Sequence, residues 1–166
     1  MKNLVLVAIL SLFLSCDQSA NNSSEEIVEN TKDTTVIKSA DVRSNEEDLK
    51  KKGYQTFSYM EGDTTYLMQQ YYMVFLKSGP TRGQDSTEAA ELQMKHMAHL
   101  ERMATEGYTS LTGPMGDDGD LRGIVVFNTA TQAEADSLAN LDPMVKAGRL
   151  KVEIHPWWAA KGGKLK

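Results

Sequence analysis

Two hydrophobic periodicities alternate along the chain after residue 66, and each predicts a different kind of element. Stretches that are apolar on both faces, such as 71–76 and 124–127, are typical of strands covered on both sides. Residues 86–105 repeat apolar positions at helical spacing and are followed by Gly107, which predicts a long helix. The predicted elements are, in chain order, a strand over 66–77, a helix over 86–105, strands over 109–112 and 121–128, a helix over 131–141 with one more turn to 148, and a strand over 149–155.

This order of elements favours an α+β domain with the ferredoxin-like βαββαβ arrangement, because helices recur between strands and a tight hairpin lies in the middle. Two helices can cover only one face of a four-stranded sheet. The other face is substantially apolar as well, so we expect a second copy of the chain to cover it in a homodimer.

The N-terminal residues have the pattern of an export signal. Residues 4–14 form an almost unbroken apolar run after Lys2. Eleven helical residues span roughly half of a ~30 Å hydrocarbon core, so the run predicts a signal peptide over 1–15 rather than a transmembrane helix. The run ends at Cys16, the only cysteine, and resembles the lipidation signal of a bacterial lipoprotein. The alternative is a plain secretory signal followed by an incidental cysteine.

Lipidation of Cys16 would hold the protein on a membrane of the bacterial cell envelope, outside the cytoplasm, because several acyl chains together anchor stably. Residues 16–50 then predict a disordered acidic tether, since 17–50 hold nine acidic residues, four basic residues and no aromatic. Residues 51–65 place aromatics at near-alternating positions before Gly62-Asp63, which predicts a hairpin arm ahead of a domain over 66–166. The formal charge of the whole chain is −5, which argues against a nucleic-acid partner.

The three histidines are candidates for chemistry, and their positions differ in meaning. His96 lies within the apolar face of the predicted long helix, and His99 lies at the border of that face. An imidazole that has lost water stays neutral near pH 7 and can accept a proton. The alternative is a core histidine whose ring is hydrogen-bonded to a backbone carbonyl. His155 lies on the polar face of the last predicted strand.

Metal chemistry has little support in the sequence. His96 and His99 are three residues apart, a spacing that can place two imidazoles on one ion, but a zinc site needs at least a third protein ligand. The acidic cluster Asp117-Asp118-Gly119-Asp120 lacks the twelve-residue calcium pattern and favours a hairpin turn. We therefore expect neither a metal nor a cofactor.

Asp142 is the second candidate for the site. It precedes Pro143, so the pair predicts an N-cap and first residue of a short helical turn. That structural role leaves a second one open, because the fixed carboxylate of an N-cap can also accept a hydrogen bond from an imidazole N–H.

Two stretches of the chain resemble the YCII-related (YciI-like) family, and the resemblance spans about residues 71–157. One is His96 on a helix rich in Leu and Met, followed seventeen residues later by Gly113-Pro114. The other is the stretch 142–148, with the sequence DPMVKAG, before a strand that ends in Pro156-Trp157. The resemblance implies a ferredoxin-like domain that pairs into a dimeric α/β barrel. It also implies a His–Asp dyad in a cleft, which falls on His96 and Asp142.

Two functions follow as hypotheses. One branch of the family resembles a dehydrochlorinase acting on chlorinated hydroxyquinols, while most members have no assigned reaction. The chain is then either an envelope-anchored module that binds a small molecule or scaffolds a complex, or a cofactor-independent lyase or isomerase. In the enzyme, His96 is the general base and Asp142 fixes its tautomer. A His96 ring nitrogen bonded to Asp142 and open to a pocket would favour the enzyme.

Overall fold

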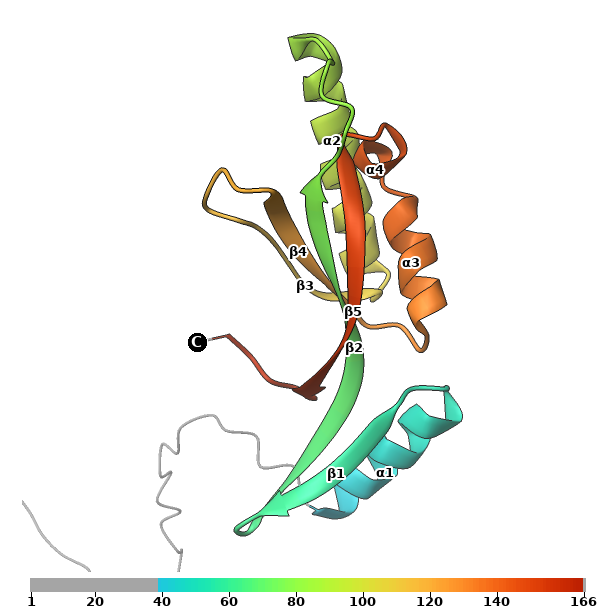
Figure 1. Ribbon diagram of the computed structural model, residues 1–166. Helices are drawn as coiled ribbons and strands as arrows, with labels where there is room; N and C mark the ends of the chain where they lie inside the picture. The colour runs from blue at the N-terminus through green and yellow to red at the C-terminus, as the bar shows by residue number, and fades with distance from the viewer. Residues whose placement is uncertain (1–38, 166) are drawn as a thin grey trace, which may run out of the picture. The chain divides into compact units, whose positions relative to one another are not determined.

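The computed structural model describes residues 39–165, so the predicted signal peptide, Cys16 and the tether as far as residue 38 lie outside the described residues. The elements, shown in Figure 1, are α1 (Ser39–Lys51), β1 (Thr56–Glu61), β2 (Thr64–Ser78), α2 (Ser86–Thr105), β3 (Thr109–Pro114), β4 (Leu121–Phe127), α3 (Gln132–Asn140), α4 (Pro143–Lys146) and β5 (Leu150–Ala160).

The sheet is antiparallel and is organised around β2. Over residues 72–77 this strand lies between β4 and β5, and β3 pairs with β4, which gives the order β3-β4-β2-β5. With α2 connecting β2 to β3 and α3 and α4 connecting β4 to β5, this is the ferredoxin-like arrangement. The predicted fold class is confirmed.

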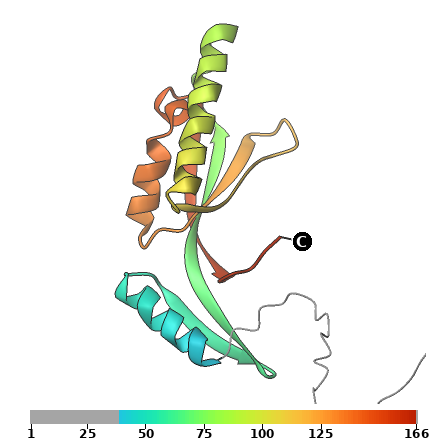
Figure 2. The ribbon, with the colours of Figure 1, turned by 180° about the vertical axis from the view of Figure 1, so that it is seen from behind.

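Three helices, α2, α3 and α4, cover one face of this four-stranded part of the sheet. Figure 2 shows α2 in front of the strands, with α3 beside it. Side chains that alternate along β2, β4 and β5 meet these helices in one buried cluster, whose members are Tyr72, Val74, Leu76, Met103, Val125, Phe127, Ala135, Ala139, Met144 and Leu150. The opposite face of this part of the sheet carries the intervening residues, and none of α2, α3 and α4 covers it.

The helix that carries the candidate histidines begins and ends where the sequence predicts. Its N-cap is Asp85, whose side chain accepts hydrogen bonds from the backbone N–H groups of Thr87 and Glu88. Just beyond its C-terminus Gly107 has a positive φ of 80°, a conformation that glycine adopts at little cost.

The prediction of a disordered tether is wrong over residues 39–50, because they belong to α1. This helix packs on β1 and β2, with Val42 only 1% exposed. Glu46 accepts hydrogen bonds from Ser58 of β1 and from Lys50, both at 2.6 Å. A composition average misses a helix that docks through so few apolar side chains.

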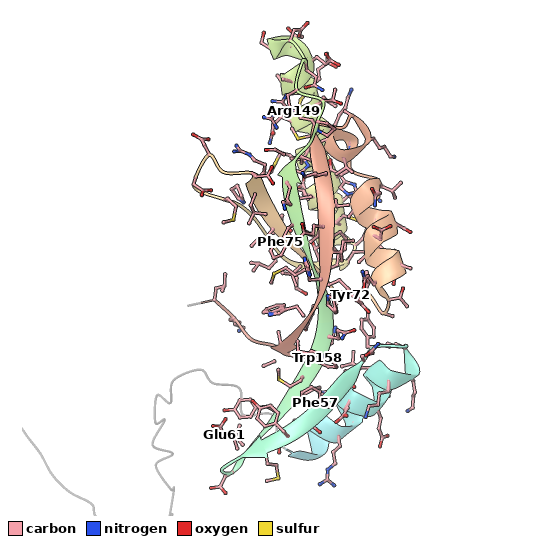
Figure 3. The ribbon with its side chains drawn as sticks, viewed as in Figure 1. Phe57, Glu61, Tyr72, Phe75, Arg149 and Trp158 are labelled. Carbon is pink, nitrogen blue, oxygen red and sulfur yellow. The ribbon has the colours of Figure 1, made fainter. Side chains whose placement is uncertain are left out.

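The hairpin at Gly62-Asp63 is present, but it is not a separate arm. Its second strand, β2, continues without a break into the sheet that carries the core. On the other edge of β2, β5 continues past residue 155 to Ala160 and pairs with residues 68–72. Here the rings of Phe57 and Trp158 lie 5.0 Å apart, and Figure 3 labels both residues.

Among residues 39–165 no helix is both long and apolar enough to cross a membrane.

Candidate active site

His96 of α2 and Asp142, the residue that precedes α4, form a buried pair. Nδ1 of His96 lies 2.6 Å from Oδ2 of Asp142, and the two residues are 8% and 2% exposed. The other carboxylate oxygen, Oδ1, accepts a hydrogen bond of 2.8 Å from the backbone N–H of Met144. The carboxylate therefore caps α4 and holds the imidazole at the same time, as the spacing of the Asp-Pro turn allows.

The pairing decides which ring nitrogen of His96 is available for chemistry. A carboxylate only accepts hydrogen bonds, so we assign the proton of the neutral ring to Nδ1, which donates it to Asp142. Nε2 is then the nitrogen that can accept a proton. Within the part of the chain that the structure describes, Nε2 makes no hydrogen bond to another residue.

His99 is buried rather than at the border of the apolar face, being only 7% exposed. The guanidinium of Arg102 donates to Nδ1 of His99 across 3.3 Å, an arrangement that requires Nδ1 to be unprotonated. Burial lowers the pKa of His99 below its ordinary value of 6.5, the nearby charge of Asp142 opposes this, and the charge of Arg102 adds to it. His99 is thus a neutral neighbour of the dyad and does not line the pocket beside His96.

His155 is not part of this site. Its side chain is exposed on the uncovered face of the sheet, where Nε2 lies 2.8 Å from Oε1 of Glu153 and the ring lies 5.4 Å from that of Phe75. Val152 and Ile154 of the same strand point to the opposite face and pack on the core, so the alternation of β5 separates His155 from the dyad.

A pocket of about 400 Å³ lies beside His96, between α2, the β3–β4 pair and the segment that follows α4. Its walls are mainly apolar, with side chains of Leu76, Met97, Leu100, Pro114, Met144 and Leu150. Met97 is 53% exposed although the helical pattern places it on the packed face, because it stands at this opening. Gly113 and Gly123 line the pocket without a side chain, and a Cβ added to Gly123 would lie 3.0 Å from the carbonyl oxygen of Gly113.

Three arginines also line the pocket, and no pattern in the sequence indicates that they belong to the site: Arg82, Arg122 and Arg149. Arg82 and Arg149 are placed at the pocket because the backbone after β2 crosses close to the backbone before β5. The N–H groups of Gly79 and Thr81 donate to the carbonyls of Arg149 and Gly148, each at 2.9 Å. A Cβ on Gly79 would clash with the carbonyl oxygen of Gly148, so only glycine fits this crossing.

No group of three or more histidine, cysteine, aspartate or glutamate side chains within residues 39–165 is arranged to hold a metal ion. His96 and His99 are both near Asp142, but the Nδ1 atoms of the two rings are engaged with Asp142 and Arg102 respectively.

Several solved structures match the chain. One of them is 5-chloro-2-hydroxyhydroquinone dehydrochlorinase (TftG) from Burkholderia phenoliruptrix, in complex with 2,5-dihydroxybenzoquinone. The two chains are 21% identical, and the match covers 52% of this chain and 92% of that one with a TM-score of 0.40. No curated protein matches the chain significantly.

The family itself is shown by a match to the whole domain. The family model of the YCII-related domain matches residues 68–158, which is more than half of the chain and runs from β2 to β5. His96, Asp142 and the pocket beside them all fall within the matched residues. The chain therefore belongs to the YCII-related domain family.

Proposed function

We propose that the protein is a lyase or isomerase that works without a cofactor, with His96 as its general base and Asp142 as the group that orients it. The observation that carries this proposal is the 2.6 Å hydrogen bond between the two side chains at the edge of a pocket. A histidine with a purely structural role would be expected to bond to a backbone carbonyl in a filled interior. A protein that only binds a ligand or scaffolds a complex would need the pocket, but it would not need the hydrogen bond between His96 and Asp142.

The reaction begins with a substrate that presents an acidic C–H bond to Nε2 of His96. The C–H bond breaks, the proton moves to Nε2, and the electron pair stays on the substrate as an enolate. The imidazolium is stabilised because its Nδ1–H bond to Asp142 becomes charge-assisted. In an isomerase the same proton returns at another carbon. In a lyase the electron pair forms a double bond and expels a leaving group as an anion, and the proton passes to water.

Replacing either member of the dyad should abolish most turnover without unfolding the protein. We expect His96→Ala and Asp142→Asn to lower kcat by about 10²–10⁴, the usual contribution of a positioned base. Asparagine keeps an oxygen for the N-cap but offers an N–H to Nδ1, which would force the proton onto Nε2. The assay follows hydroxyquinols, small lactones and related substrates with the full-length protein.

The control for this experiment is His155→Gln, since His155 is exposed on the other face of the sheet. Its turnover should equal that of the wild type, and thermal unfolding should show that all three variants are folded. Turnover that His96→Ala leaves unchanged would contradict the proposal. A wild-type protein that is inactive on the whole panel would count for the binding module instead.

We further propose that a second copy of the chain covers the uncovered face of the sheet. Leu111 and Trp157 lie on this face and are 45% and 42% exposed, and they line a hollow with the buried Tyr71 and Val126 and with residues 159–165. Large apolar side chains gathered on one sheet face favour burial against a partner. Self-pairing of such a face requires only a two-fold axis.

Sedimentation equilibrium should therefore give twice the mass of one chain, and Leu111→Asp should shift the protein toward the monomer by placing a charge in the interface. The matched control is Leu141→Asp, because Leu141 is also 45% exposed but follows α3, away from the sheet face. A wild-type monomer at all concentrations, or equal effects of the two substitutions, would refute the dimer.

We also propose that the protein is anchored to the bacterial cell envelope through lipid on Cys16, which lies outside the described residues. Support comes from the apolar run that ends at this cysteine. When the full chain is expressed in a bacterium fed labelled palmitate, we expect label in the membrane fraction. Cys16→Ser should lose both the label and the membrane association, and Ser19→Ala should keep them. An unlabelled wild-type chain would indicate a plain secretory signal.

A further inference from the structure

We propose that the pocket beside His96 takes an organic acid whose carboxylate is held by Arg82, Arg122 and Arg149. The inference rests on the proposed function, because it names the substrate class of the same site. The pocket has an excess of positive residues: three arginines line it, and no aspartate or glutamate does. The one carboxylate nearby, that of Asp142, is behind His96 and is engaged with His96 and with the backbone of Met144.

The three arginines of the pocket differ in their hydrogen-bond partners from the cations that form ion pairs elsewhere in the described residues. Several cations elsewhere are close to an acid, as with Lys77 and Glu153 at 3.1 Å or Arg102 and Glu106 at 3.4 Å, although Lys161 donates to the neutral amide of Gln69. In the pocket, Arg149 donates to the neutral amide of Gln84 and Arg82 donates to a backbone carbonyl.

Arg122, the third arginine, also lacks a close ion pair among the described residues. It approaches a carboxylate only at 3.9 Å, and that carboxylate belongs to the fully exposed Asp118. A guanidinium stays charged at every physiological pH, so the pocket keeps a local excess of positive charge that an anion would neutralise.

The three side chains come from separate segments that the fold brings to one end of the sheet. Arg82 and Arg149 are placed by the crossing of Gly79 over Gly148, described above. Arg122 is the extra residue of a β-bulge, because Leu76 pairs with Gly123 while Lys77 pairs with Leu121. A bulge re-aims the side chain of the residue it inserts. Figure 3 labels Arg149 at the end of β5 that lies near α2 and α4.

The apolar walls of the pocket favour a ligand that carries an apolar group beside its carboxylate. Its walls are leucine, methionine and proline side chains, so an inorganic anion would leave most of them in contact with water. A volume of about 400 Å³ is within the range of sites for small organic ligands. The combination fits a carboxylic acid with a ring-sized apolar body. With the carboxylate at the arginines, the apolar part of the molecule extends along the walls toward α2, the helix that carries His96.

Binding of benzoate, compared with its neutral isostere benzamide, tests this inference on the full-length protein by calorimetry or NMR titration. We expect benzoate to bind at least tenfold more tightly than benzamide. Arg82→Gln and Arg149→Gln should each weaken benzoate binding by about tenfold, the loss of one charge-assisted contact. Arg102→Gln is the control, since Arg102 is outside the pocket and should leave the affinity unchanged.

His96→Ala separates this inference from the proposed function. The variant should still prefer benzoate, because the arginines remain, even where its turnover is lost. Equal affinity for benzoate and benzamide, no uptake of either, or arginine variants that bind as the wild type does would overturn the anion site. Those results would leave the dyad untouched, whereas unchanged turnover in His96→Ala would remove the base and leave the anion site. Should Arg149→Gln fail to fold, the exposed Arg82 still decides the outcome.

Discussion

The site depends on how the two oxygens of one carboxylate are used. Oδ1 of Asp142 receives the backbone N–H of Met144 and so caps a helix of only four residues, while Oδ2 receives the ring of His96. The first contact fixes the carboxylate, because Pro143 already sets the backbone that follows it. The second contact then fixes the tautomer of the imidazole. The short helix that connects α3 to β5 therefore also holds the side chain of His96 on α2.

The same connection also shapes the pocket. Directly after α4 the chain turns at Gly148, and its backbone meets the end of β2 at Gly79, where no side chain larger than hydrogen fits. The crossing places Arg149 in the lining of the pocket. Met144, which packs in the core, lines the same pocket. Orientation of His96 and placement of the arginine at the pocket therefore both depend on the eight residues from Asp142 to Arg149. In the proposed function, a substrate whose carboxylate binds the arginines would meet a base that the same segment holds.

Much of this arrangement could be predicted from the sequence because the signals are local. The bounds of α2 follow from the cap at Asp85, the apolar period and Gly107, and the Asp-Pro turn indicates both the start of α4 and a fixed carboxylate. The burial of His99 could not be predicted in this way. A helical wheel places it at the border, whereas in the structure α2 is also covered from the side of α3 and α4, and a wheel contains no information about that neighbour.

The arginines and α1 could not be predicted for the opposite reason, since their signals are tertiary. Arg82, Arg122 and Arg149 are far apart in the chain, and they meet only because of a register shift between β2 and β4 and a backbone crossing at Gly79. Helix α1 is acidic and polar, and one buried valine together with the hydrogen bond from Ser58 of β1 to Glu46 docks it on the sheet. Average composition therefore assigned residues 39–50 to a disordered segment.

The protonation state of the His96 ring nitrogens tests the account most directly. Two-bond ¹H–¹⁵N correlation spectra of the labelled full-length protein report which nitrogen of a neutral imidazole carries the proton, and signals missing in a His96→Gln variant assign the ring. We expect the proton on Nδ1, where Asp142 accepts it, and an unprotonated Nε2 that faces the substrate. A proton found on Nε2 would mean that Asp142 does not hold the ring as described. The unprotonated nitrogen would then be Nδ1, which faces Asp142 and not the pocket, so His96 could not act as the proposed base.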